Sequence, residues 1–113
     1  MEIDVVFTGV AVTRLDAAAA WYGRLFGRPA DIIVNPGEIM WRLSDSAWLY
    51  LVRDSGRAGR GLAALCVPDL GKALAEVAGR GIERPPVKPE GDAALKASFT
   101  DPDGNTVHLI QVT

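Results

Sequence analysis

Near its C-terminus the chain reads FTDPDGNTVHL, from Phe99 to Leu109. Within the DPDGN segment, proline presets the backbone for a turn, aspartate stabilises the turn through local hydrogen bonds, and glycine takes the positive φ that closes a hairpin. Apolar and polar residues alternate on both sides of this segment, which is typical of half-buried strands. The sequence therefore predicts a closing β-hairpin with strands over 95–100 and 106–112.

A weak internal repeat precedes this hairpin. The stretch from Val12 to Ala18 lies 55 positions before the stretch from Val67 to Ala73, and in both an alternating apolar run leads through a turn into a helical pattern. Two repeats of this length account for nearly the whole chain, whose 113 residues suit one domain. We expect a single domain over 1–113, made of modules 1–55 and 61–113 that a Gly- and Arg-containing linker joins.

The first module is expected to follow the order βαβββ. Its predicted elements are a strand over 3–12, a helix over 14–26 and three short strands near 30–34, 38–43 and 46–52. Thr13 is the expected N-cap of the helix. Gly27 is expected to end the helix in the left-handed conformation, and Pro29 blocks its continuation.

The second module repeats this order. A strand over 62–67 leads into a helix over 69–79, and the proline-containing loop 84–92, with room for one short strand, leads into the closing hairpin. One helix covers only one face of a four-stranded sheet, so the other face must be covered by its twin, within the chain or across a dimer. The predicted fold class is α+β, two βαβββ modules with a concave ligand cavity.

Composition and charge exclude several kinds of partner. The net charge of −2 and the dispersed basic residues argue against nucleic acid, and Arg53, Arg57 and Arg60 are interpreted as part of a solvated linker. No apolar run approaches the ~20 residues that cross a membrane, and the acidic N-terminus lacks the basic region of a signal peptide.

A single cysteine excludes an internal disulfide. We expect a soluble, cytoplasmic protein that binds neither nucleic acid nor membranes.

The segment from Phe99 to Leu109 closely resembles the ending of glyoxalase, bleomycin-resistance and extradiol dioxygenase proteins, which form the vicinal oxygen chelate superfamily. Two further stretches support this resemblance. Phe7 to Tyr22 is similar to the first strand and helix of the family, and Leu62 to Ala73 is similar to the start of its second module. The resemblance spans almost the whole chain and implies the same fold of two βαβββ modules.

Metal-dependent members of this superfamily hold the metal with His, Gln or Glu side chains on strands that face the cavity. The resemblance implies that these positions fall on Phe7, Leu62 and His108, with Tyr50 or a neighbour as the fourth. Phe7 and Leu62 have no donor atoms, and phenolate binding is disfavoured for Tyr50 because a phenol has an ordinary pKa of ~10. A stable divalent site needs about three good ligands, so we expect neither a metal nor another cofactor.

Aromatic residues on the expected third and fourth strands point instead to a binding surface. Trp48 and Tyr50 are two residues apart and share one face of a strand, while Leu49 and Leu51 are expected to pack on the helix. Rings with one polar neighbour suit a planar or amphipathic ligand, although they could equally fill a core or a dimer interface. The candidate ligand-binding residues are Phe7, Trp41, Trp48, Tyr50, Leu62 and His108.

Two reactive side chains need separate interpretations. His108 could contact a ligand, act as a general acid or base, or be a hydrogen-bonded structural residue, and no orienting carboxylate is evident from its position. Cys66 shares a strand face with Leu62 and Ala64 and is interpreted as a buried, inert thiol.

Three functions remain open. The first is a metal-independent homodimer that binds a small organic molecule, for example by sequestering an antibiotic. The second is a metal-independent isomerase, cyclase or lyase with His108 or a loop carboxylate as acid or base; the carboxylates concerned are Glu38, Asp45, Glu90 and Asp92. The third is a non-enzymatic partner domain whose cavity is filled by its own side chains. The missing metal ligands favour a non-catalytic binder over a metal-dependent glyoxalase or dioxygenase.

Overall fold

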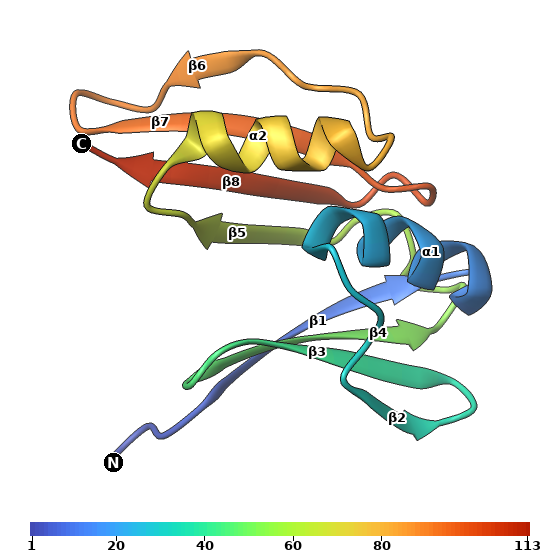
Figure 1. Cartoon of the computed structure of the whole chain (residues 1–113). Coiled ribbons are helices and arrows are strands. Elements are labelled where there is room, and N and C mark those ends of the chain that lie inside the picture. The colour runs from blue at the N-terminus through green and yellow to red at the C-terminus, as the bar shows by residue number, and fades with distance from the viewer.

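A computed structural model describes all residues from 1 to 113 (Figure 1). The first half contains β1 (Val6–Val12), α1 (Leu15–Phe26), β2 (Ile32–Asn35), β3 (Glu38–Ser44) and β4 (Ala47–Arg53). The second half contains β5 (Leu62–Cys66), α2 (Leu70–Gly79), β6 (Val87–Pro89), β7 (Ala94–Thr100) and β8 (Thr106–Val112). The predicted α+β fold, with the order βαβββ repeated twice, is confirmed.

Each half forms its own mixed four-stranded sheet. The strand orders are β1-β4-β3-β2 and β5-β8-β7-β6, so the first strand of each half lies at a sheet edge, beside the last strand of that half. Those two pairs, β1 with β4 and β5 with β8, are parallel, and all other pairs are antiparallel. The register places Phe7 opposite Trp48 in the first sheet and Ala64 opposite His108 in the second. Paired residues share a sheet face, so each register tells which side chains lie together.

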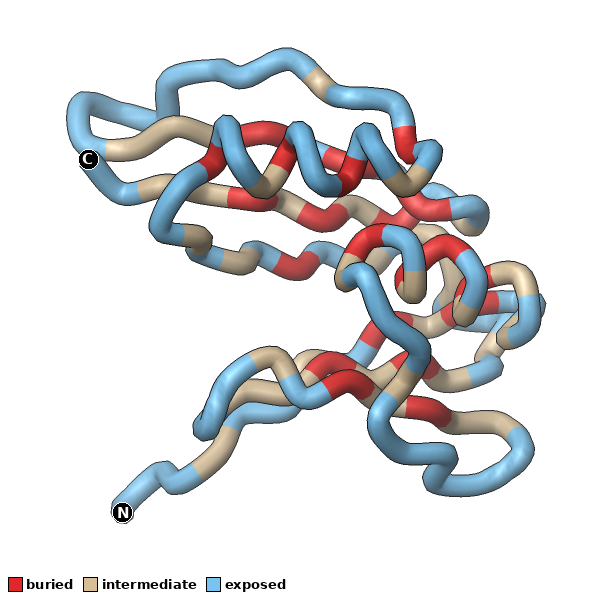
Figure 2. The backbone as a smooth tube through the Cα atoms, viewed as in Figure 1, coloured by how far each residue is buried: buried red, intermediate tan, exposed pale blue.

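One face of each sheet is covered by a helix, and the two covered faces meet in a single core. Leu49 and Leu51 of β4 are fully buried, as are Val107 of β8 and Leu74 of α2, within one cluster of 19 buried hydrophobic residues. Helix α1 contacts both β4 and α2, and in Figure 1 it lies between the two sheets. Figure 2 shows the buried residues gathered on the two helices and on the strands behind them. The other face of each sheet therefore lies outside this core.

We call these uncovered sides the open faces. The first open face carries side chains of β1, β3 and β4, and the second carries side chains of β5, β7 and β8. The first open face comprises Phe7, Gly9, Ala11, Glu38, Met40, Arg42, Trp48, Tyr50 and Val52. The second open face comprises Leu62, Ala64, Cys66, Ala94, Lys96, Ser98, Thr100, Thr106, His108, Ile110 and Val112.

The helix ends differ in part from those predicted. Gly27 ends α1 with φ 80°, as predicted. The prediction of Thr13 as N-cap was wrong, because Arg14 occupies that position without a capping side chain. Thr13 instead donates hydrogen bonds from its backbone N and its Oγ1 to Oδ1 of Asp103, at 3.2 and 2.6 Å. A partner 90 residues away thus replaces the local contact that the sequence suggested.

The DPDGN turn ties the two halves of the chain together through two buried side chains. Asp101 accepts a hydrogen bond of 2.8 Å from the Tyr22 hydroxyl of α1, and Asn105 donates one of 2.9 Å to the carbonyl of Ala11 in β1. Oδ1 of Asn105 also accepts from the backbone amides of Gly59 and Gly61, at 3.0 and 2.7 Å. The linker's arginine side chains are exposed, as expected, but its backbone is fixed to the protein body.

Candidate ligand-binding site

The first open face carries a pair of stacked aromatic rings. The ring centroids of Phe7 and Trp48 lie 6.2 Å apart with an interplanar angle of 25°. Phe7 is 54% exposed although it is a large apolar side chain, and Trp48 is half-buried. Both rings stand on adjacent strands at positions that the register makes opposite one another. They form a flat apolar surface of the kind that binds planar molecules.

Tyr50 extends this surface along β4. It lies opposite Gly9 of β1, and a Cβ atom added to Gly9 would come within 2.4 Å of the Tyr50 ring. Only glycine at this position lets the ring lie across β1. Beyond the ring is a pocket of about 410 Å³, lined by Gly9, Ala11, Tyr50, Val52, Arg57, Arg60 and Gly61.

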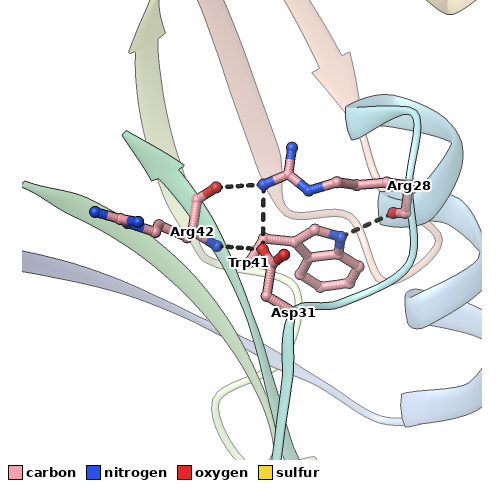
Figure 3. A network of polar contacts seen from close by, with 4 residues as sticks. All are labelled: Arg28, Asp31, Trp41 and Arg42. Atoms are coloured by element: carbon pink, nitrogen blue, oxygen red, sulfur yellow. Dashed lines mark hydrogen bonds and ion pairs between the residues drawn. The ribbon is translucent and has the colours of Figure 1, made fainter. Parts of the chain in front are cut away.

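Trp41 does not belong to this surface. It lies opposite Leu49 on the helix-covered face and is fully buried, and its Nε1 donates a hydrogen bond of 3.0 Å to the carbonyl of Arg28 (Figure 3). Asp31 completes this network by accepting bonds from the backbone amide of Arg42 at 2.7 Å and from the Arg28 guanidinium at 3.1 Å. These bonds lower the pKa of Asp31, the Arg42 amide most of all. Trp41 is therefore a core residue rather than a ligand contact.

The middle of the second open face carries the polar side chains Ser98 and His108, where the first open face carries aromatic rings. Nδ1 of His108 and Oγ of Ser98 lie 2.8 Å apart, on positions that the β7–β8 register makes opposite. Leu62 at the sheet edge is 67% exposed. Ser98 was not predicted from the sequence as a partner of His108. Pairing β7 with β8 around the DPDGN turn would have identified it, because the same register places Thr100 opposite Thr106.

Two of the candidate loop carboxylates are already engaged in ion pairs. Glu90 forms an ion pair of 2.7 Å with Lys96. The hydrogen bond from the Lys96 ammonium lowers the pKa of Glu90 more than any other influence. Asp45 pairs with Arg42 at 3.1 Å on the other sheet. No carboxylate is hydrogen-bonded to His108, so the structure contains a serine–histidine pair without the third group that orients a catalytic histidine.

Cys66 is exposed, and its interpretation as a buried thiol was wrong. It shares its strand face with Leu62 and Ala64 as predicted, but that face is uncovered and β5 is an edge strand. Alternation along a strand predicts which residues share a face, and it does not say whether anything covers that face.

The positions to which the resemblance assigns metal ligands do not offer a ligand set in this chain. Phe7 and Tyr50 stand on one sheet, and Leu62 and His108 stand on the other. Of these four, only His108 has a good donor atom at neutral pH. No group of three or more His, Cys, Asp or Glu side chains is arranged so that it could hold a metal ion. The residues present therefore do not fit a metal centre of the kind that the resemblance implies.

Comparison with known proteins identifies the class. Residues 4–109 match the Glyoxalase/Bleomycin resistance protein/Dioxygenase superfamily. A glyoxalase/bleomycin resistance protein from Catenulispora acidiphila is 31% identical, with a TM-score of 0.90 over 96% of this chain and 98% of the other. The chain belongs to the Glyoxalase/Bleomycin resistance protein/Dioxygenase superfamily, as the DPDGN segment predicted.

Two more distant structures share the fold. A bleomycin-binding protein complexed with bleomycin is 22% identical, with a TM-score of 0.77 over 97% of this chain and 99% of that one. TnmS3, an antibiotic binding protein from a Streptomyces species, is 23% identical, with a TM-score of 0.74 over 96% of this chain and 95% of that one. None of the curated proteins compared matches the chain significantly. Neither helix of the chain is long and apolar enough to cross a membrane.

Proposed function

We propose that this protein binds a small planar or amphipathic organic molecule on its first open face and releases it chemically unchanged. The observation that carries the proposal is the stacked pair Phe7 and Trp48, whose rings are 6.2 Å apart on an uncovered sheet face. Contiguous apolar surface that is exposed on a soluble protein commonly marks a site that binds a ligand or another protein. Bound molecules would gain by stacking and by burial of apolar area, and neither gain requires a metal.

Two relatives support this kind of function. Two proteins with this fold are a bleomycin-binding protein, solved in complex with bleomycin, and an antibiotic binding protein. At 22% and 23% identity they share the fold, and their ligands do not transfer to this chain. Sequestration of an antibiotic or a similar compound is the form of the proposal that they favour.

The proposal includes a homodimer. Large apolar side chains are exposed on both open faces, with Phe7 at 54%, Leu62 at 67% and Val112 at 69%. The helix-covered faces already meet within one chain, so these open faces require cover from elsewhere. A second copy that brings its second open face against the first open face of this chain would bury both and enclose a cavity between an aromatic wall and a polar wall.

The test is the substitution Trp48→Ala, with binding of a panel of planar natural products measured by calorimetry. Loss of the indole should abolish binding, while Ile33→Ala, which removes an exposed side chain from the helix-covered side of β2, should leave binding unchanged. Binding that is equal in both variants would contradict the proposal.

A second candidate is metal-independent catalysis, which the 2.8 Å contact between Ser98 and His108 favours. Under that function His108 would transfer a proton within the same cavity. The substitution His108→Ala separates the two: it should largely spare the affinity of a non-catalytic binder, and it should stop product formation by an enzyme. If neither Trp48→Ala nor His108→Ala changes any small-molecule interaction, the open faces serve only to bury one another.

A further inference from the structure

We infer that the ligand of the first open face is an aromatic compound bearing an anionic group, such as a carboxylate, sulfonate or phosphate, which Arg57 and Arg60 bind. This inference rests on the proposed function and specifies the chemical class of the ligand. Arg57 and Arg60 line the pocket of about 410 Å³ that continues from the edge of the Tyr50 ring. A molecule whose ring lies on the aromatic surface would therefore place a substituent beside two guanidinium groups.

The segment that carries these arginines is held in a defined position. Asn105, which is fully buried, accepts hydrogen bonds from the amides of Gly59 and Gly61, the residues on either side of Arg60. Gly59 has φ 92°, and a Cβ there would come within 2.7 Å of the carbonyl oxygen of Asp103. Because the backbone on either side of Arg60 is already fixed, less conformational entropy is lost when the arginine side chain binds an anion. The rigid attachment distinguishes this segment from a solvated linker.

The positive charge of Arg57 and Arg60 makes the pocket beside Tyr50 favourable for an anion. Arg60 makes no ion pair, and its Nη2 donates only to the carbonyl of Gly56, at 3.0 Å. Arg57 lies 3.6 Å from Asp54, a loose pair in which the arginine side chain is 84% exposed. No carboxylate lines the pocket; Glu38, the acidic residue of the first open face, lies across β4 from it, opposite Val52. Guanidinium groups bind carboxylate, sulfonate and phosphate oxygens through paired hydrogen bonds.

The test uses two probes with the same ring and opposite charge, naphthalene-2-sulfonate and (2-naphthyl)trimethylammonium. Their affinities for the full chain are measured by calorimetry and by amide NMR shifts. The sulfonate should bind at least about tenfold more tightly than the cation. Arg57→Gln and Arg60→Gln should each weaken sulfonate binding about fivefold, and the double variant should weaken it about 25-fold. A loss of about fivefold is the effect expected when one solvent-accessible ion pair is removed.

Arg14→Gln is the matched control, because Arg14 is an exposed arginine at the start of α1, on the helix-covered side of the first sheet. It should leave the affinity of the sulfonate unchanged. If the two probes bind equally, or if the double variant binds the sulfonate as the unsubstituted protein does, the anionic ligand class is wrong while binding on the aromatic face stands. If neither probe binds, the proposed function fails and this inference fails with it.

Discussion

The hydroxyl group of Tyr22 in α1 donates a hydrogen bond of 2.8 Å to Oδ2 of Asp101, which lies 79 residues further along the chain in the DPDGN turn. Both residues are buried. The other oxygen of Asp101 accepts from the amides of Asp103 and Asn105, both at 2.9 Å. The segment that identifies the family thus stabilises its own turn and binds the helix of the other module.

Tyr22→Phe should lower the free energy of unfolding by about 1–3 kcal/mol, because it leaves an oxygen of a buried carboxylate without one of its donors. Urea unfolding followed by circular dichroism measures this loss. Tyr50→Phe removes the same hydroxyl from a half-buried ring on the open face and should change stability by less than about 0.5 kcal/mol. Equal effects of the two substitutions would contradict the role assigned to Tyr22.

The same contact predicts a dependence on alkaline pH. Burial, followed by the negative charge of Asp101, raises the pKa of Tyr22 above its ordinary value of 10.0. The folded state therefore keeps this proton to higher pH than the unfolded chain does. The resulting stability is fully present below pH ~10 and is lost as the pH rises further, towards the folded-state pKa.

Urea midpoints at pH 8, 10 and 11 test this dependence. The unsubstituted protein should lose more stability over this range than Tyr22→Phe, in which the titrating group is absent and all other groups are the same. Parallel losses in the two proteins would show that Tyr22 does not carry the effect.

Gly59→Ala should destabilise the protein by about 2 kcal/mol or more, because alanine is strained at positive φ and its Cβ would meet the Asp103 carbonyl oxygen at 2.7 Å. Gly56→Ala is the control in the same linker, since a Cβ there would lie 3.4 Å from Asp54 without a positive φ. It should cost less than about 0.5 kcal/mol. A freely solvated linker would instead tolerate both changes equally in thermal unfolding.

Leu62→Asp should shift a dimer towards monomer without destabilising the monomer, because Leu62 is 67% exposed on the second open face. A carboxylate placed between two sheet faces would be desolvated on association. Sedimentation velocity over a concentration series measures the equilibrium. Ile33→Asp introduces the same charge at a side chain that is 77% exposed outside both open faces, and it should leave the equilibrium unchanged.

Sequence patterns predicted the fold well because the turn residues and the apolar periodicity are local. The helix predicted over 14–26 is observed as Leu15–Phe26, and the hairpin around the DPDGN turn is observed as β7 and β8. Burial of Leu49 and Leu51 beneath the helix is also confirmed. The helix and the hairpin depend on residues that are close together in the chain.

The errors concern strand register and long-range contacts, which apolar alternation along the chain does not determine. Trp41 was grouped with Trp48 and Tyr50, but the β3–β4 register, with its irregularity between Arg42 and Ser44, places it opposite Leu49 on the covered face. Thr13 bonds to Asp103 rather than to its own helix. The attachment of the linker to Asn105 was likewise invisible, because nothing local marks an amide side chain that accepts from a segment 44 and 46 residues away.

Native mass spectrometry of protein purified without added metal and mixed with planar natural products distinguishes metal-free binding from catalysis. We expect a dimer that carries a ligand of unaltered mass and no divalent ion, and we expect the Trp48→Ala dimer to carry no ligand. Release of a compound of changed mass would instead show catalysis. A stoichiometric divalent ion would contradict the conclusion drawn from Phe7, Tyr50 and Leu62 that these positions provide no metal site.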